Sequence, residues 1–304
     1  MKKYMKNRLL ALFIGLVLLS GCESRKDTIH IATKPMSEQF ILGEMLALLI
    51  EENSDLHVKI TKGVGGGTSN IHPAMVKGDF DLYPEYTGTG WLVILKKDTL
   101  LPPDQLFSEL QKEYSREYGL KWVAPYGFNN AYSLAVSNEM AKKYNLKTFS
   151  DLALYPALFT FGAEYDFYEI NDGYADLCAY YNLKFKKNLD MDIGLKYEAM
   201  KSGKIDVINI FTTDGQLSHA NLTTLKDDKH FFPSYYCATI VREETLKEHP
   251  ELERILEKMN GILTDQEMAD MNYKVDVEHR TEREVAVEFL KKKGLLNPQL
   301  SYGK

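Results

Sequence analysis

TIHIATKPMSEQFILGEMLALLIEENSDLHVKITKGVGGG, residues 28–67, is the stretch from which the fold class of this chain can be read. Residues 28–33 and 57–62 alternate apolar and polar side chains, as strands with one buried face do. Between them, residues 37–52 repeat apolar side chains at helical spacing, and Ser37 stands where an N-cap is expected. The stretch therefore predicts a strand, a helix and a second strand, followed by a glycine-rich turn.

The unit continues after the turn Gly63–Gly67 with a predicted helix over 69–77 and a short strand over 80–83. This βαβαβ order indicates an α/β fold whose sheet is mostly parallel and covered by helices on both faces. Ligand sites in such sheets lie beyond the carboxyl ends of strands, where the turn and Tyr83–Thr89 fall. The turn lacks the complete glycine pattern of a dinucleotide loop and the Lys-Ser/Thr of a P-loop. We interpret it as close packing of a turn on a helix.

A second set of alternating segments follows without an intervening linker or a tandem repeat. The predicted strands are 132–136, 159–162, 206–211 and 238–241, and the predicted helices are 138–144, 173–181, 195–202 and a broken helical tail over 243–293. This organisation predicts two lobes joined by two crossing strands, near Phe128–Asn130 and Pro233–Tyr235. We expect residues 28–129 with 234–304 to form one lobe, and residues 130–233 to form the other.

The first residues predict export and attachment to a membrane. Four basic side chains precede the apolar run Leu9–Leu19, which is too short to span a bilayer and is typical of a secretory signal. Leu19-Ser20-Gly21-Cys22 has the pattern of a bacterial lipobox. We expect a signal peptide over 1–21, lipid on Cys22 and a short tether over 22–27, with the mature protein on the extracytoplasmic face of the cell membrane. The alternative is an ordinary cleaved signal with a chance cysteine.

Composition argues against several other classes of protein. Loss of residues 1–21 would remove four basic and no acidic residues and take the formal net charge from −6 to −10, which disfavours nucleic acid as a partner. Besides Cys22 only Cys178 and Cys237 remain, too few for a disulfide framework or a metal cluster, and free thiols are favoured over a bridge. The seven histidines show no H-E-x-x-H spacing and there is no G-x-S-x-G motif. We therefore expect no catalysis, no cofactor and no metal.

Aromatic residues are abundant: 19 Tyr and 14 Phe stand beside 2 Trp. Four of them fall in loops or at strand ends along the expected lobe edges, namely Tyr86, Tyr132, Phe211 and Tyr235. Rings arranged as a box can hold a trimethylammonium group, which has no N–H to donate and is attracted by π faces. At ~1–2 kcal/mol per desolvated ring, four rings approach the ~8 kcal/mol of micromolar binding. Spacing alone does not select these four rings from the other aromatic side chains.

Tyr83-Pro-Glu-Tyr-Thr-Gly-Thr89 resembles the signature of the glycine betaine/carnitine/choline-binding proteins of osmoprotectant ABC importers. The resemblance extends over about residues 29–295. Further motifs occur in the order of that family: Lys34–Gln39, Gly66–Thr68, Gly78–Asp81, Asp192–Tyr197, Thr212–Gly215 and Phe232–Tyr236.

The resemblance implies a periplasmic-binding-protein-like fold of type II, with two crossing strands and a ligand site in the cleft between the lobes. It implies that the four rings form an aromatic cage, with half of it on each lobe, and that the lobes close on the ligand. Lys34 and Thr89 correspond to residues that grip a betaine carboxylate. The remaining polar residues expected to bind ligand are Gln39, Asn130 and Asp166.

One position departs from the family pattern, because Ile170 stands where relatives carry an Arg. Arg can form two charge-assisted hydrogen bonds to a carboxylate, whereas Ile donates none. This tilts the expected ligand toward choline over glycine betaine or carnitine. Another betaine-like metabolite or an amino acid remains an alternative, and a surface-anchored hydrolase is a weaker one. The expected partners are an ABC permease subunit and the membrane, with the binding protein itself a monomer.

Overall fold

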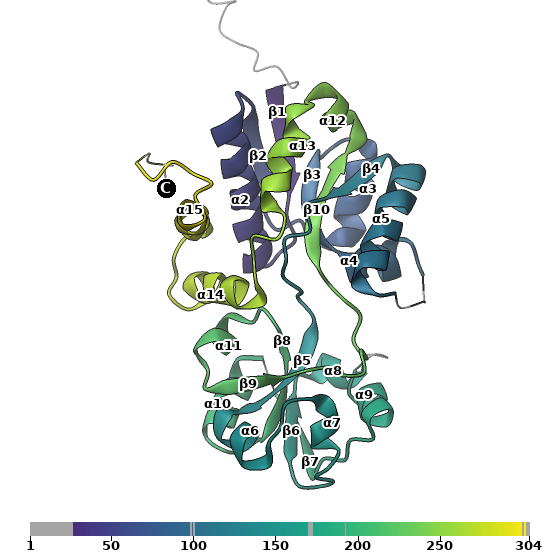
Figure 1. The fold of residues 1–304 in the computed structure, drawn as a ribbon, viewed down its shortest axis with the longest axis vertical. Coiled ribbons are helices and arrows are strands. Elements are labelled where there is room, and N and C mark those ends of the chain that lie inside the picture. Colours follow the sequence, from purple (N-terminus) through teal and green to yellow (C-terminus); the bar gives the residue numbers. More distant parts are fainter. Residues whose placement is uncertain are drawn as a thin grey trace, which may run out of the picture.

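The computed structural model describes residues 27–97, 99, 101–169, 173–191, 193–299 and 301. Figure 1 shows two lobes stacked along the long axis of the molecule, each built on its own sheet. Both sheets have five strands, in the orders β2-β1-β3-β10-β4 and β7-β6-β8-β5-β9. The expected two-lobed α/β architecture is confirmed.

The sheet of lobe 1 contains the strands β1 (Thr28–Ala32), β2 (His57–Thr61), β3 (Leu82–Tyr86), β4 (Leu120–Val123) and β10 (Cys237–Arg242). Strand β1 pairs in parallel with β2 and β3, as the βαβαβ pattern predicts. Strand β10 pairs antiparallel with both β3 and β4. The sheet is therefore mixed, because β10 enters it from the other lobe and runs against its neighbours (Figure 1).

Strand β3 differs from its predicted position. It spans Leu82–Tyr86 rather than 80–83, so the first four residues of the signature lie inside the sheet and are buried. Only Thr87–Thr89 (α4) extends beyond the strand. The glycine turn packs on α3 as expected: Asn70 Nδ2 donates to the carbonyl of Gly65 at 2.6 Å.

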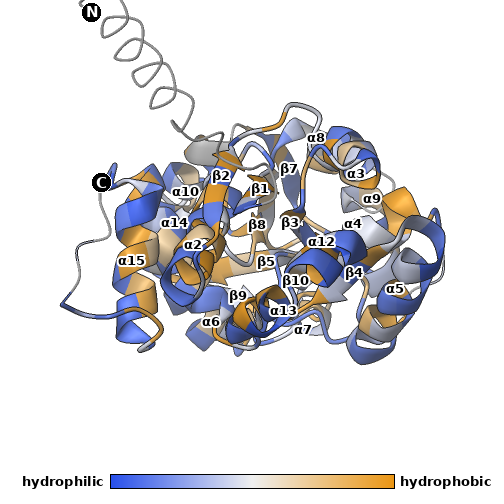
Figure 2. Ribbon diagram, turned by 90° about the horizontal axis from the view of Figure 1, so that it is seen from above, coloured by the Kyte–Doolittle hydropathy of each residue, from blue (hydrophilic) through white to orange (hydrophobic). Residues whose placement is uncertain are grey.

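Helices pack around the lobe 1 sheet. They are α2 (Ser37–Asn53), α3 (Thr68–Lys77), α5 (Pro103–Tyr118), α12 (Glu243–Glu248), α13 (Glu251–Leu256), α14 (Asp265–Asp276) and α15 (Glu282–Lys292). The N-cap of α2 is Met36 rather than Ser37, whose hydroxyl instead donates to Asp276 of α14 at 2.5 Å. In Figure 2, α5 and α15 carry both hydrophobic and hydrophilic residues, as amphipathic helices that cover a core do.

Lobe 2 contains the strands β5 (Tyr132–Ser137), β6 (Thr160–Ala163), β7 (Lys187–Asp190), β8 (Val207–Phe211) and β9 (Leu222–Leu225). Strand β6 is parallel to β7 and β8, whereas β5 is antiparallel to β8 and β9. The helices are α6 (Asn138–Tyr144), α7 (Phe149–Leu152), α8 (Tyr165–Glu169), α9 (Tyr174–Tyr181), α10 (Ile193–Lys201) and α11 (Gly215–His219).

Two chain segments connect the sheets, one between β4 and β5 and the other between β9 and β10 (Figure 1). They lie side by side, because Asn129 forms an antiparallel bridge with Tyr236 and the amide of Asn130 donates to the carbonyl of Tyr235 at 3.1 Å. A further contact joins the lobes where the ring of His219 in α11 stacks on Tyr273 in α14, with 3.7 Å between centroids. The exact lobe limits at 129/130 and 233/234 stay a prediction.

Two further sequence expectations concern the cysteines and the membrane. Cys178 and Cys237 are free thiols, half-buried and buried respectively. Across the described part of the chain, no helix combines the length and apolar character needed to cross a bilayer. Cys22, the signal peptide and nearly all of the expected tether lie outside the described residues.

Candidate ligand-binding site

Tyr86 ends strand β3 and is the lobe 1 ring with the most contacts to charged groups. Its side chain is buried, with 5% exposed, and its hydroxyl donates to Glu38 Oε1 at 2.5 Å. The ammonium nitrogen of Lys34 lies 4.6 Å from the centroid of the ring. This ring therefore already holds a positively charged nitrogen against its π face.

Lys34 forms an ion pair with Glu85, a neighbouring carboxylate that has no solvent exposure. Lys34 Nζ donates to Glu85 Oε1, and the same carboxylate accepts the hydroxyls of Thr68 at 2.7 Å and Tyr83 at 3.2 Å. The backbone amide of Tyr86 donates to it at 2.7 Å. Lys34, expected to grip a ligand carboxylate, is thus an internal counter-ion in this structure.

Tyr235 lies against the signature segment. A Cβ atom at Gly88 would stand 2.6 Å from the Tyr235 ring and 2.9 Å from the carbonyl oxygen of Ser234, so only glycine permits this approach. Thr87 strengthens the contact, because its hydroxyl donates to the carbonyl of Ser234 at 3.0 Å and its amide to the carbonyl of Tyr236 at 2.9 Å. Thr87 and Gly88 of the signature therefore hold the crossing segment 234–236 against lobe 1.

Tyr132 and Phe211 form the lobe 2 half of the expected cage. They are directly opposite each other in the β5–β8 pair, and their ring centroids are 4.4 Å apart. Phe167 and Phe232 extend this ring cluster, at 5.2 and 5.7 Å from Tyr132. Tyr132 and Phe211 are half-buried, so the pair keeps a solvent-accessible part.

A charged network supports the end of β8 that carries Phe211. Asp214 Oδ2 accepts the amide of Phe211 at 3.2 Å and the hydroxyl of Tyr197 at 2.7 Å. Burial raises the pKa of Asp214. Next to it, the fully buried Lys196 donates to Glu164 at 3.1 Å. The network fixes the backbone at this end of the strand.

Asn130, in the first crossing segment, connects the surroundings of the lobe 1 and lobe 2 rings. Asn130 lies between Tyr235, to which its amide donates, and Tyr132, two residues further along the chain. Its side-chain Nδ2 donates to Glu38 Oε1 at 3.0 Å, the same oxygen that accepts the Tyr86 hydroxyl. A hydrogen-bond network through Asn130 and Glu38 therefore links the Tyr86 ring of lobe 1 to the chain segment that leads to Tyr132 of lobe 2.

Of the remaining expected ligand-binding residues, the structure describes the side chains of Gln39 and Thr89 but not that of Asp166. Gln39 is fully buried; its Oε1 accepts the Lys34 amide at 3.4 Å, and its Nε2 has no hydrogen-bond partner among the described residues. Thr89 ends α4 and is half-buried. Asp166 belongs to α8, but its side chain lies outside what the structure describes, as does Ile170.

Two carboxylates of this site, Glu38 and Glu85, carried no role in the sequence-based assignment. Both stand inside motifs of the family pattern, at Lys34–Gln39 and Tyr83–Thr89. The available signal was an acidic residue within a mostly apolar or aromatic context, which is costly to bury and so has a reason to be there. The rings of Phe167 and Phe232 were also missed, because nothing in their spacing separates them from core residues.

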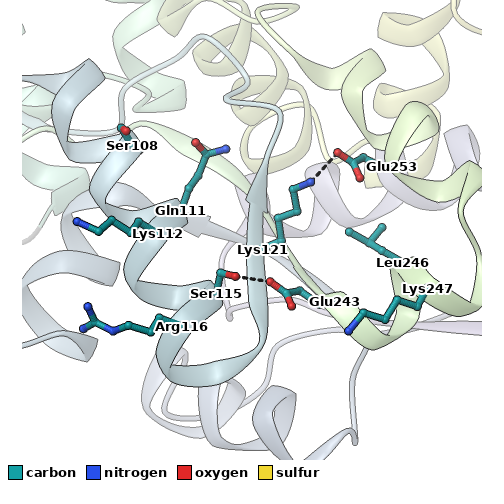
Figure 3. A pocket seen from close by; sticks show the side chains of 10 residues that line it. All are labelled: Ser108, Gln111, Lys112, Ser115, Arg116, Lys121, Glu243, Leu246, Lys247 and Glu253. Carbon is teal, nitrogen blue, oxygen red and sulfur yellow. Dashed lines mark hydrogen bonds and ion pairs between the residues drawn. The ribbon is translucent and has the colours of Figure 1, made fainter.

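A pocket of about 800 Å³ lies on lobe 1 between α5 and α12 (Figure 3). Two contacts link side chains that line it: Lys121 pairs with Glu253 at 2.7 Å, and the Ser115 hydroxyl donates to Glu243. It contains no aromatic side chain and lies apart from the four rings. We place the candidate site at the chain crossings because the four expected rings border them.

Comparisons with known proteins identify the family to which this chain is related. Residues 27–292 match the family model described as the substrate-binding domain of ABC-type glycine betaine transport systems. The chain is 45% identical over 292 residues to the ergothioneine transport permease/ergothioneine binding protein EgtU of Helicobacter pylori strain G27; the alignment covers 94% of this chain and 52% of that protein. The chain thus spans about half the length of this relative.

Other relatives match along almost their whole length. The carnitine transport binding protein OpuCC of Listeria monocytogenes is 36% identical over 301 residues, covering 95% of this chain and 97% of that protein. Among solved structures, a glycine betaine/carnitine/choline ABC transporter structure is 32% identical with a TM-score of 0.84, covering 88% of this chain and 99% of that one. Apo YehZ of Escherichia coli is 25% identical with a TM-score of 0.78, at the same coverages. This chain belongs to the family of substrate-binding domains of ABC-type glycine betaine transport systems.

Proposed function

We propose that this protein captures a solute with a trimethylammonium head and delivers it to the permease of an ABC importer, and that a betaine such as ergothioneine is its preferred ligand. The observation that carries the proposal is the position of the four rings. Tyr86 and Tyr235 border the chain crossings from lobe 1, and Tyr132 and Phe211 border them from lobe 2. A cation between them would contact π faces from both lobes, so binding would favour closure.

The chemistry of the lobe 1 half supports a methylated cation. The ammonium of Lys34 lies 4.6 Å from the centroid of the Tyr86 ring, and this contact supports a site that accommodates a positive charge. A trimethylammonium group adds apolar methyl surface that an ammonium lacks, and a half-buried ring pair such as Tyr132–Phe211 can cover that surface. Amino acids, whose ammonium needs hydrogen-bond acceptors, gain less from such rings.

Two observations point to different tails on the ligand. The relative with 45% identity is named for ergothioneine, and those with 36% and 32% identity are named for carnitine and glycine betaine. All three ligands are betaines that carry a carboxylate. In contrast, the pairing of Lys34 with Glu85 and the presence of Ile170 leave less positive charge for a carboxylate, which favours choline. We place ergothioneine first because the relative named for it is 45% identical, against 36% and 32% for the other two, and choline second.

Isothermal titration of the purified mature protein with ergothioneine, carnitine, glycine betaine and choline tests the proposal. We expect micromolar or tighter binding of at least one of them. N,N-dimethylglycine is the matched control for glycine betaine, because it exchanges one methyl group for an N–H. Binding of unmethylated amino acids with no gain on methylation would contradict the proposal, and a choline affinity above all three betaines would reverse our order of ligands.

The remaining parts of the proposal concern the localisation and the oligomeric state of the protein. We propose that lipid on Cys22 tethers the protein to the outer face of the cell membrane and that it acts as a monomer. Mass spectrometry of the processed protein would detect the lipid, and a Cys22→Ala variant should appear in the medium. Recovery of an unlipidated wild-type protein from the membrane fraction would contradict the anchor, and a dimer in sedimentation analysis would contradict the monomer.

A further inference from the structure

Glu38 is a buried carboxylate at the junction of the lobes that the cage model does not use. It lies in the first turn of α2 with 4% of its surface exposed. No ion pair within the described residues includes it. By contrast, Glu85 is balanced by Lys34, and Glu44 on the same helix by Lys62 and Arg283. Glu38 therefore leaves one uncompensated negative charge beside the Tyr86 ring.

The side chains of Tyr86, Thr213, Asn130 and Asn272 turn hydrogen-bond donors toward this carboxylate. The Tyr86 hydroxyl donates at 2.5 Å, Asn130 Nδ2 at 3.0 Å and Asn272 Nδ2 at 3.3 Å. Asn272 Nδ2 also donates to the carbonyl of Thr213 in lobe 2 at 2.9 Å. The donors thus come from strand β3 and helix α14 of lobe 1, from the chain crossing at Asn130 and, with Thr213, from lobe 2.

The two asparagine side chains donate to Glu38 while their own carbonyl oxygens stay without hydrogen bonds. The oxygens Asn130 Oδ1 and Asn272 Oδ1 are buried and have no hydrogen-bond partner among the described residues. Leaving buried acceptors unpaired costs free energy, and burying an unpaired charge costs more. Hydrogen bonds to a carboxylate favour its ionised form. Because burying this carboxylate and leaving two amide oxygens unpaired both cost free energy, we expect the carboxylate to have a functional role.

We propose that Glu38 is a specificity-determining residue, whose negative charge behind the Tyr86 hydroxyl makes the site favour a methylated ammonium over an uncharged group of the same shape. The inference rests on the proposed function and assigns part of its selectivity to this residue. The hydrogen bond to a carboxylate enriches the tyrosine ring in electron density, and the charge acts directly on a cation a few ångströms beyond the ring. The attraction acts on the head of the ligand and so does not depend on the tail.

Burial raises the pKa of Glu38, and the hydrogen bonds from Tyr86, Thr213, Asn130 and Asn272 oppose this effect. A bound cation should favour the ionised form. Affinity for a trimethylammonium ligand should then fall as the pH is lowered through the pKa of Glu38. The other titratable groups around it are Lys34, Tyr86, Glu85, Cys237 and, beside Ser37, Asp276.

Two pairs of ligands isolate the charge from the shape. Glycine betaine is compared with 3,3-dimethylbutanoate, and choline with 3,3-dimethylbutan-1-ol, each by displacement of the tightest ligand found. In the wild type the charged member of a pair should bind more tightly. In Glu38→Gln this preference should shrink about ten-fold, which corresponds to about 1.4 kcal/mol, and the pH dependence of the affinity should flatten.

The matched control is Glu44→Gln, which removes a buried carboxylate from the same helix and should leave the preference unchanged. Tyr86→Phe keeps the ring but breaks the link to Glu38, and should reduce the preference even if Glu38→Gln does not fold. A preference that persists in both variants would overturn the proposal. Equal weakening of charged and uncharged ligands would also overturn it, because it would reveal a purely structural role. A wild type without affinity for any trimethylammonium compound would instead refute the proposed function.

Discussion

Replacing Lys34 by methionine should destabilise the ligand-free protein by about 3 kcal/mol. The side chain of Lys34 is 11% exposed and that of its partner Glu85 is fully buried. Removing one member of a buried ion pair costs ~3–5 kcal/mol, because the other charge stays buried without compensation. We expect the lower end of this range, since Thr68, Tyr83 and the amide of Tyr86 still donate to the carboxylate.

Urea denaturation followed by circular dichroism measures this loss, and the melting temperature should fall by ~6–12 °C at ~2–4 °C per kcal/mol. Lys121→Met is the matched control, because its pair with Glu253 is 37% and 44% exposed and should contribute at most about 1 kcal/mol. The double variant Lys34→Met/Glu85→Gln should recover part of the stability. A loss below about 1 kcal/mol in Lys34→Met would refute the view that Lys34 serves as a counter-ion inside lobe 1.

Three further substitutions test the site and its surroundings. Phe211→Ala should weaken binding of a trimethylammonium ligand about ten-fold. The stability of the free protein should change little, because the ring is half-buried. Calorimetric titration measures the affinity and thermal melting the stability, and an unchanged affinity would show that Phe211 is not part of the cage. Tyr86→Ala should cost ~3–5 kcal/mol of stability, since only 5% of its side chain is exposed; an unaltered urea midpoint would show that the ring is not part of the core. Burial lowers the pKa of His72, whose ring nitrogens have no partner among the described residues. The stability linked to its neutral form is therefore present above about pH 6.5 and is lost as the pH falls through the lowered pKa. His72→Phe should accordingly lose less stability than the wild type between pH 7 and pH 5, and parallel losses would exclude His72 as a source of acid sensitivity.

Elements with strong apolar periodicity were predicted well, and elements without it were not. Helix α2 and strands β1 and β2 lie within a residue or two of their predicted ends. Helix α5 was missed, because its buried residues are only Leu106, Leu110 and Tyr114 among many polar ones. Its proline start and its end at Gly119, in the left-handed conformation, were the usable signals. Strand β7 is exposed along its length, so no alternation reveals it.

The expected ring pairs depended on different kinds of information. Tyr132 and Phe211 could be proposed only from the family pattern, and they lie opposite each other because the β5–β8 register places them so. Tyr86 was expected in a loop or at a strand end, and it ends the buried strand β3, which lies two to three residues further along than predicted. Lys34 was expected to contact a ligand carboxylate, and in this structure it pairs with Glu85.

The amino-acid sequence alone predicted the α/β class and the two-lobed organisation, which the structure confirms, and it predicts an export signal, because these follow from local periodicity and short motifs. The tertiary structure alone decided how the charges are distributed around the site. Glu38 and Asn272 are 234 residues apart and Lys34 and Glu85 are 51 apart, yet each pair is in contact. Whether a carboxylate is balanced by a lysine or left with neutral donors depends on distances of a few ångströms between distant segments, and such distances exist only after both lobes have folded.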